Sequence, residues 1–268
     1  MGSDTADGLA RTASSHPAVR VLARAGYAAN GVVHLLIGAV VLAVAFGGSG
    51  EGDQQGAFRA IAQAPLGGVA LWFLALALAA LTLWYIAEGV LASGESTARR
   101  WGRRLAEWGK AIVYASLAAT AVSIALGARP DGDESTRSMS QALLALPGGP
   151  FLLGAIGVGV VVVGGVFVVR GFTRGFLPKI TQPGGILGRV VTATGVVGYI
   201  AKGVALVVVG ALLTTAAVTV DPGASGGLDA AIKSLLALPF GTALVAAVGI
   251  GLIAYSVYCF FRARYARL

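Results

Sequence analysis

The sequence predicts an all-α integral membrane protein: six transmembrane helices that form three tandem, parallel helical-hairpin repeats in a pseudo-threefold arrangement. The 268 residues are 56% hydrophobic and 12% charged, which lies outside the usual composition of soluble domains. Residues 26–38 (GYAANGVVHLLIG) and 198–210 (GYIAKGVALVVVG) also repeat one pattern, with both outer glycines in register. The composition indicates the membrane, and the repetition indicates a duplicated structural unit.

Six apolar stretches are long enough to cross a hydrocarbon core, which takes about 20 helical residues. Their apolar residues are continuous rather than alternating, which favours helices over a β-barrel. The expected spans are 19–46, 65–91, 104–127, 147–171, 188–217 and 239–263. Because the first stretch recurs as the fifth, we interpret it as an uncleaved span rather than a signal peptide.

The formal net charge of +8 is distributed unevenly along the chain. Most basic residues lie in the N-terminal segment, in the second-to-third and fourth-to-fifth connections and at the C-terminus, whereas the other three loops are short and acidic. This asymmetry predicts a multi-pass protein of a plasma membrane with both termini in the cytoplasm. The partners expected are the lipid bilayer, with anionic lipids at the basic inner loops, and no nucleic acid.

A third copy of the pattern follows when Asn30 is aligned with Lys110 and Lys202. The second helices agree, because Pro65, Pro147 and Pro239 are each followed two residues later by glycine. We expect each proline in the first turn of its helix, where a missing N–H is tolerated. The predicted organisation is a polar cytoplasmic tail (1–18) and hairpin repeats at 19–91, 104–171 and 188–264.

Small residues recur seven positions apart on the first helix of each repeat. They are Gly31 and Gly38 in the first copy, Ala111 and Ala118 in the second, and Gly203 and Gly210 in the third. A spacing of seven keeps both residues on one stripe of a helix. In lipid, helices associate through close packing at small residues, so we expect these glycines at helix–helix contacts.

The recurring first-helix signature resembles that of a bacterial membrane family known as domain of unknown function 1206. The resemblance is carried by Arg24-Ala25-Gly26-Tyr27 with Asn30-Gly31-Val32, and by Gly198-Tyr199 with Lys202-Gly203-Val204. The middle copy departs from the signature, with Ala106-Glu107 in place of Gly-Tyr and Ala111 in place of glycine. The resemblance implies three tandem two-helix modules and a membrane location, but no chemistry.

No residue pattern predicts catalysis, so we expect no enzyme activity, no catalytic residues and no cofactor. The single cysteine, Cys259, excludes multi-cysteine sites, and His34 has no ligand partner at metal-binding spacing. A structural histidine is the simpler interpretation of His34. The glycine-rich stretch at 154–165 lacks a lysine–serine pair and lies within a span, so it predicts helix packing rather than phosphate binding.

Polar residues on the first helices suggest two classes of function. Asn30, His34, Lys110, Tyr114 and Lys202 are candidates for a cytoplasm-facing polar vestibule in a channel or transporter for an anion or another small solute. The alternative for both lysines is snorkelling to the membrane boundary. The alternative function is a non-catalytic scaffold or assembly factor that binds other membrane helices and anionic lipids, as a homo-oligomer or with a membrane-protein partner.

Overall fold

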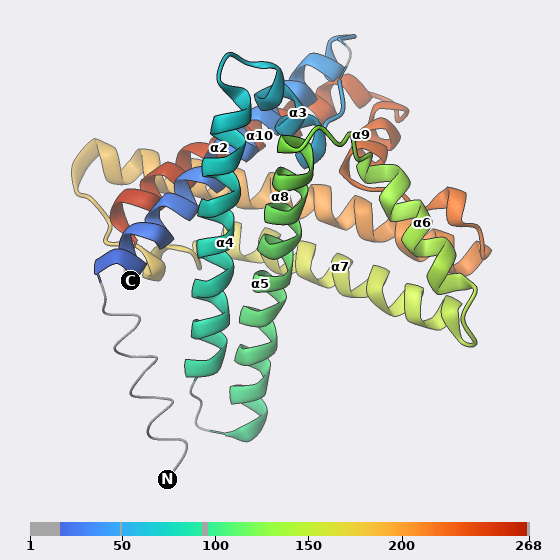
Figure 1. Cartoon of the computed structure of the whole chain (residues 1–268), viewed down its shortest axis with the longest axis horizontal. Helices are drawn as coiled ribbons and strands as arrows, with labels where there is room; N and C mark the ends of the chain where they lie inside the picture. The colour runs from blue at the N-terminus through green and yellow to red at the C-terminus, as the bar shows by residue number, and fades with distance from the viewer. Residues whose placement is uncertain (1–16, 49, 93–95, 267–268) are drawn as a thin grey trace. The chain divides into compact units, whose positions relative to one another are not determined.

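The computed structural model describes residues 17–48, 50–92 and 96–266, so almost all of the expected tail (1–18) lies outside the described residues. Six long helices are apolar enough to cross a membrane, which confirms the six expected spans (Figure 1). They are α2 (Pro17–Ala45), α4 (Gly67–Leu91), α5 (Thr97–Ala125), α7 (Gly149–Phe172), α8 (Gly185–Thr219) and α10 (Gly241–Tyr265). The pseudo-threefold arrangement stays a prediction.

Several hydroxyl groups of the spans bond to the backbone of their own helix, which suits a bilayer. The hydroxyl of Thr82 donates to the carbonyl of Leu78, and that of Thr214 donates to the carbonyl of Gly210, each four residues back. Large apolar side chains such as Val162 and Val169 remain exposed on α7. Only 17% of the most apolar stretch of this helix is buried. Lipid is the solvent that suits these faces.

Each acidic connection contains a short amphipathic helix rather than a plain turn, which differs from the expectation. These helices are α3 (Gln54–Gln63), α6 (Gly132–Leu144) and α9 (Leu228–Leu236). Aspartate begins α6, because the side chain of Asp131 accepts the backbone N–H groups of Asp133 and Glu134. Two further short elements are the 3₁₀ turns η1 (Leu177–Lys179) and η2 (Pro222–Ala224).

The three repeated prolines lie in the turn before each second span, and the prediction that they occupy its first helical turn is wrong. In the first repeat the N–H of Gly67 donates to the carbonyl of Ala64 at 2.8 Å, across Pro65 and Leu66. Leu66 has φ 60°, so this is a type II β-turn with proline at its second position. Gly148 and Phe240 take the same positive φ in the other two repeats.

The glycine that follows each turn is required by sterics. A Cβ on Gly67 would collide with the carbonyl oxygen of Ile61, at the end of the preceding short helix. Gly149 and Gly241 meet Leu143 and Leu236 in the same way. The repeated Pro-X-Gly signature therefore marks a tight corner between a surface helix and a span.

The chain divides into two compact units, one of Met1–Asn30, Ile61–Ala128 and Cys259–Leu268, the other of Gly31–Ala60 and Arg129–Tyr258. In the first unit Tyr27, Leu81, Trp84 and Tyr85 form a buried core. In the second unit an aromatic cluster joins α8, α10 and the connection before η1. Its members are Phe176, Tyr199, Tyr255 and Tyr258, with ring centroids 5.0–6.1 Å apart in each contacting pair.

The spans pair by one rule, since the second span of a repeat packs against the first span of the following repeat. Thus α4 contacts α5 and α7 contacts α8. The last repeat pairs with the first, because Gly38 of α2 lies against Gly249 of α10. Small residues at equivalent positions make these contacts: Gly171 faces Ile200 as Gly89 faces Trp108.

Candidate functional site

Lys202 places a charged group near the midpoint of α8. It follows Gly185, the first residue of this 35-residue helix, by about 25 Å along the axis, which is too deep for the boundary position that snorkelling requires. Its ammonium Nζ lies 3.0 Å from Nε2 of His34 on α2. The side chain is therefore directed into the second unit.

Aromatic rings surround the Lys202 ammonium. Nζ lies 4.5 Å from the ring centroid of Tyr255 and 5.5 Å from that of Phe167, distances at which a ring face attracts a cation. His34 is 6% exposed and its ring lies 4.8 Å from that of Tyr255. A neutral imidazole with its proton on Nδ1 can accept from the ammonium, so the two groups fit together as Lys⁺ and neutral His.

A cavity of about 210 Å³ adjoins this pair within the second unit. Its walls are mostly apolar, and Lys202, His34 and Gln54 are its polar members. The lining is His34, Ile37, Gln54, Lys202, Ala205, Leu206, Val209, Leu228 and Leu252. Because Gln54 begins α3 and Leu228 begins α9, the cavity extends from mid-span toward the acidic connections.

This direction differs from the expected one. The sequence predicts a vestibule that faces the cytoplasm, at the basic end of the spans. The structure puts Lys202 at the middle of α8, and the cavity extends from it toward the opposite end of the helix, along Ala205 and Val209. Lys202 is central in α8, and the α8 residues that line the cavity with it all lie on the side of the acidic connections.

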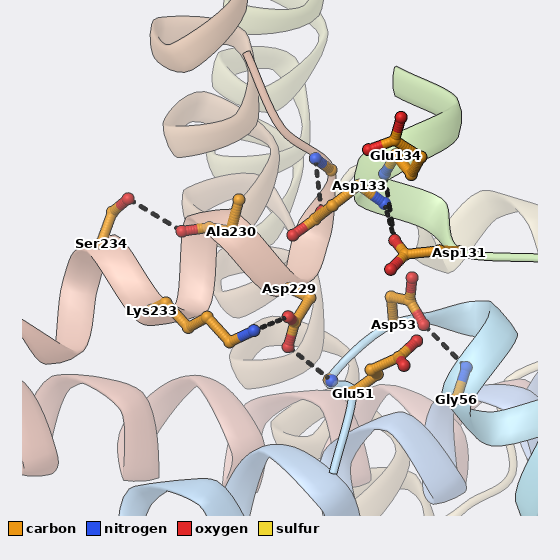
Figure 2. Close-up of polar contacts among 12 residues, drawn as sticks. Glu51, Asp53, Gly56, Asp131, Asp133, Glu134, Asp229, Ala230, Lys233 and Ser234 are labelled. Atoms are coloured by element: carbon orange, nitrogen blue, oxygen red, sulfur yellow. Dashed lines mark hydrogen bonds and ion pairs between the residues drawn. The ribbon is translucent and has the colours of Figure 1, made fainter. Parts of the chain in front are cut away.

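Three buried aspartates, one from each acidic connection, lie beside the cavity's outer residues. Asp53 precedes Gln54, Asp229 follows Leu228, and Asp133 begins α6; they are 4%, 4% and 7% exposed. Asp229 accepts the N–H of Gly52 at 3.0 Å, and Asp133 accepts that of Gly227 at 2.8 Å (Figure 2). Each of these carboxylates thus holds the backbone of another repeat.

Asp53 continues the same pattern. One oxygen accepts the N–H of Gly56 at 2.7 Å, and the other lies close to where a Cβ on Gly132 would stand, so a side chain at Gly132 would displace this carboxylate. Burial is the main cause that raises the pKa of Asp53, and the nearby carboxylates of Asp229 and Asp133 raise it further. The first repeat therefore contacts the second, the second the third, and the third the first.

Asp131 and Lys233 are charged residues near the buried aspartates, and hydrogen bonds shift the pKa of each. The pKa of Asp131 is lowered because it accepts the N–H of Glu134 at the start of α6. The pKa of Lys233 is raised because its ammonium donates to Asp229. Within the described part of the chain, no set of three His, Cys, Asp or Glu residues is placed to hold a metal ion. The aspartates instead join backbone segments through the bonds that they accept from Gly52, Gly56 and Gly227.

The other three vestibule candidates lie in the first unit. Lys110 forms an ion pair with Glu107, and its ammonium lies 4.7 Å from the ring centroid of Tyr85. Tyr114 stacks on the same Tyr85 ring at 5.4 Å. The amide of Asn30 donates to the Cys259 sulfur at 3.4 Å. Thus the structure brings together Lys202 with His34, and Lys110 with Tyr114.

The predicted packing glycines lie at close helix contacts or are buried. A Cβ on Gly203 would stand 2.6 Å from the carbonyl oxygen of Gly164, and one on Gly38 would stand 2.9 Å from that of Gly249. Gly210 approaches Gly157 similarly, and Gly31 is buried on α2. At Gly38, Gly203 and Gly210 the neighbouring backbone excludes a side chain.

Sequence reasoning missed the aspartates and Tyr255. The signal for the aspartates was present, because Gly52-Asp53 and Gly132-Asp133 occur at matching points of two repeats and Gly227-Leu228-Asp229 is a close variant. Acidic residues in short loops are usually exposed to solvent, so the sequence alone assigns these aspartates no structural role. No comparable signal marked Tyr255, whose role depends on how α10 packs against α2 and α8.

These features define a polytopic helical membrane protein built from three two-helix repeats, with a pair of a half-buried lysine and a buried histidine in one unit. The chain belongs to the family described as Domain of Unknown Function (DUF1206), whose model matches residues 25–92, 108–174 and 197–266. It is 28% identical to a protein of Bacillus subtilis (strain 168) called uncharacterized protein YxxB, over 93% of this chain and 92% of that protein. No solved structure matches the chain.

Proposed function

We propose that this protein binds a small anion beside Lys202 and His34 and carries or conducts it through the membrane. The observation that supports this proposal is the Lys202 ammonium, which lies at mid-span against a cavity. A charged side chain at the centre of a span costs about 2.5 to 3.5 kcal/mol on insertion scales, so such residues usually serve an ion or substrate pathway.

The lining favours an anion over a cation. Lys202 is the one residue with a full charge among those that line the cavity in the described part of the chain. The ammonium would repel a cation. It would attract an anion and donate hydrogen bonds to it. The pair with His34 would then give way to, or be shared with, the bound anion.

The cavity also limits the size and hydration of the anion. Its volume of about 210 Å³ is below the roughly 300 to 1,000 Å³ that is typical of sites for drug-sized ligands. Ile37, Leu206 and Leu252 offer no hydrogen bonds to replace a hydration shell. Small monovalent anions that lose water readily are therefore the proposed substrates, in preference to strongly hydrated multivalent ones.

Anion flux into proteoliposomes tests this proposal, with Lys202→Met as the variant and Lys110→Met as the matched control. Lys110 is also a lysine on a first helix, but it lies in the first unit beside Glu107. We expect Lys202→Met to lower the flux of small monovalent anions by about tenfold or more, and Lys110→Met to retain most of it. Unchanged flux in a folded Lys202→Met protein contradicts the proposal.

A scaffold remains the second candidate, supported by glycines that face no part of the described chain. A Cβ on Gly159 or Gly165 of α7 would have no neighbour within 4 Å. Small residues on an open helix face allow another helix to approach closely. Native mass measurement separates the two functions, because a scaffold purifies with a different membrane protein and a transporter purifies alone or as a homo-oligomer.

A further inference from the structure

A separate groove of about 700 Å³ lies at the basic connection between α7 and α8. Arg174, Gln182 and Arg189 line it where the two spans begin and end, whereas Val196 and Val197 line it farther along α8. The amide of Gln182 donates to the hydroxyl of Thr192 at 3.2 Å, within the lining. The groove therefore changes from cationic to apolar along the helix axis.

The connection that carries the groove is anchored in the second unit. Phe176 and Ile180 are each 1% exposed, and the Phe176 ring stacks on Tyr199 at 5.0 Å. A Cβ on Gly195 of α8 would meet the Phe176 ring, so this ring fixes the connection against the helix. The two arginines are thus presented by an ordered segment.

Arg174 occupies a backbone position that normally favours glycine. At the end of α7 the N–H of Gly175 donates to the carbonyl of Arg170, and the N–H of Arg174 donates to that of Gly171. This is a Schellman motif, with Arg174 at its left-handed residue, φ 55°. Glycine would be unstrained at this position, so the Arg174 side chain can be removed without strain in the backbone.

The charge of the connection complements an anionic headgroup. Residues 170–189 include Arg170, Arg174, Lys179 and Arg189 and no acidic residue. Guanidinium groups bind phosphate oxygens through paired hydrogen bonds. At the boundary of the spans, a cationic end and an apolar continuation match a phospholipid, whose phosphate lies at the interface and whose acyl chains enter the hydrocarbon.

We propose that this groove binds one anionic phospholipid, with its phosphate at Arg174 and Arg189 and its acyl chains along Val196 and Val197. The site is independent of Lys202 and of anion transport. It assigns a specific location to lipid recognition, which the basic composition of the inner loops predicts only in general terms.

Native mass spectrometry of the full chain tests the proposal with phosphatidylglycerol and phosphatidylcholine of the same acyl chains. The groove variant is Arg174→Gln with Arg189→Gln. The matched control is Arg170→Gln with Lys179→Gln, which removes equal charge from the same connection but outside the groove lining. We expect one phosphatidylglycerol bound with a preference of about tenfold in the parent and the control, and little preference in the groove variant.

Three outcomes overturn the lipid site. Equal loss in the control and the groove variants would show diffuse attraction by all basic residues rather than a groove. Displacement of the lipid by millimolar inorganic phosphate or glycerol phosphate would show a site for soluble phosphate. A parent without preference for phosphatidylglycerol would also contradict the proposal.

Arg174→Gly separates binding from folding. Glycine relieves the left-handed backbone, so without lipid we expect a Tm equal to or above that of the parent. The rise in Tm that phosphatidylglycerol gives the parent should be reduced in this variant. A lipid-induced rise of full size in Arg174→Gly would show that the arginine does not contact the lipid.

Discussion

Gly210 of α8 lies against Gly157 of α7, so closely that a Cβ on Gly210 would stand 2.7 Å from the Gly157 carbonyl oxygen. Gly38 and Gly249 repeat this relationship between α2 and α10. One interhelical contact is therefore used twice, at equivalent positions of different repeats. The sequence pattern that residues 26–38 and 198–210 share therefore corresponds to a repeated packing surface.

Gly203→Leu should destabilise the protein by roughly 1 to 3 kcal/mol, because the added side chain overpacks the contact with Gly164 and Val168. Gly159→Leu is the matched control, since a Cβ there has no neighbour within 4 Å. Thermal unfolding in detergent measures both. A Gly203→Leu protein as stable as the Gly159→Leu protein would contradict the close approach of α7 and α8.

Asp53→Asn should raise the Tm at neutral pH. Burial raises the pKa of Asp53 from 3.8, so between 3.8 and the raised value the folded chain binds more protons than the unfolded chain. Stability contributed by this group therefore falls as the pH rises through that window. Asparagine removes the titration and keeps an acceptor for the N–H of Gly56. A lower Tm for Asp53→Asn would show that ionised Asp53 is stabilising.

Asp131→Asn should act in the opposite direction. The pKa of Asp131 is lowered by its bond from Glu134, so its stabilising effect is present above 3.8 and is lost as the pH falls through the folded pKa. The substitution should therefore lower the Tm slightly at neutral pH and leave it unchanged in strong acid. The Tm of Asp53→Asn and of Asp131→Asn, measured across the acid range, would show whether the two substitutions change stability in opposite directions.

Topology is tested with single cysteines on exposed connections. Ser138 on α6 and Thr181 before α8 are both exposed, and the native Cys259 is buried. The charge asymmetry predicts that Ser138→Cys reacts with an impermeant thiol reagent added outside intact cells, and that Thr181→Cys reacts only after lysis. The reverse pattern would invert the orientation, so that the Lys202 cavity extended toward the cytoplasm.

The sequence was sufficient to predict the six spans and the repeats, because both depend on local composition and periodicity. Long apolar runs fix span length, and Gly38, Gly203 and Gly210 mark the repeated helix positions without knowledge of their neighbours. The short helices α3, α6 and α9 were missed, since the loops that contain them are short and polar. Their aspartates contact backbone from other repeats, a relationship that only the folded chain shows.

The candidate site was predicted in part. The sequence identifies both Lys202 and His34 as candidates for the site. However, they lie 168 residues apart in different repeats, and their 3.0 Å contact depends on how α2 packs in the second unit. Tyr255 could not be selected, because a tyrosine in an apolar helix is usually a packing residue. Lys202 lies at the middle of both the expected span 188–217 and α8, so its central position could be predicted from the sequence, whereas the direction of the cavity could not.

The most direct test of the proposed site is the reactivity of Leu206→Cys, combined with Cys259→Ser, toward small thiosulfonates of opposite charge. Leu206 lines the cavity one turn beyond Lys202. The account predicts reaction from the side of the acidic connections, faster for the negative reagent, with that preference lowered about tenfold by Lys202→Met. Reaction only from the basic side, or equal rates for both reagents in the presence of Lys202, would contradict an electropositive cavity at this position.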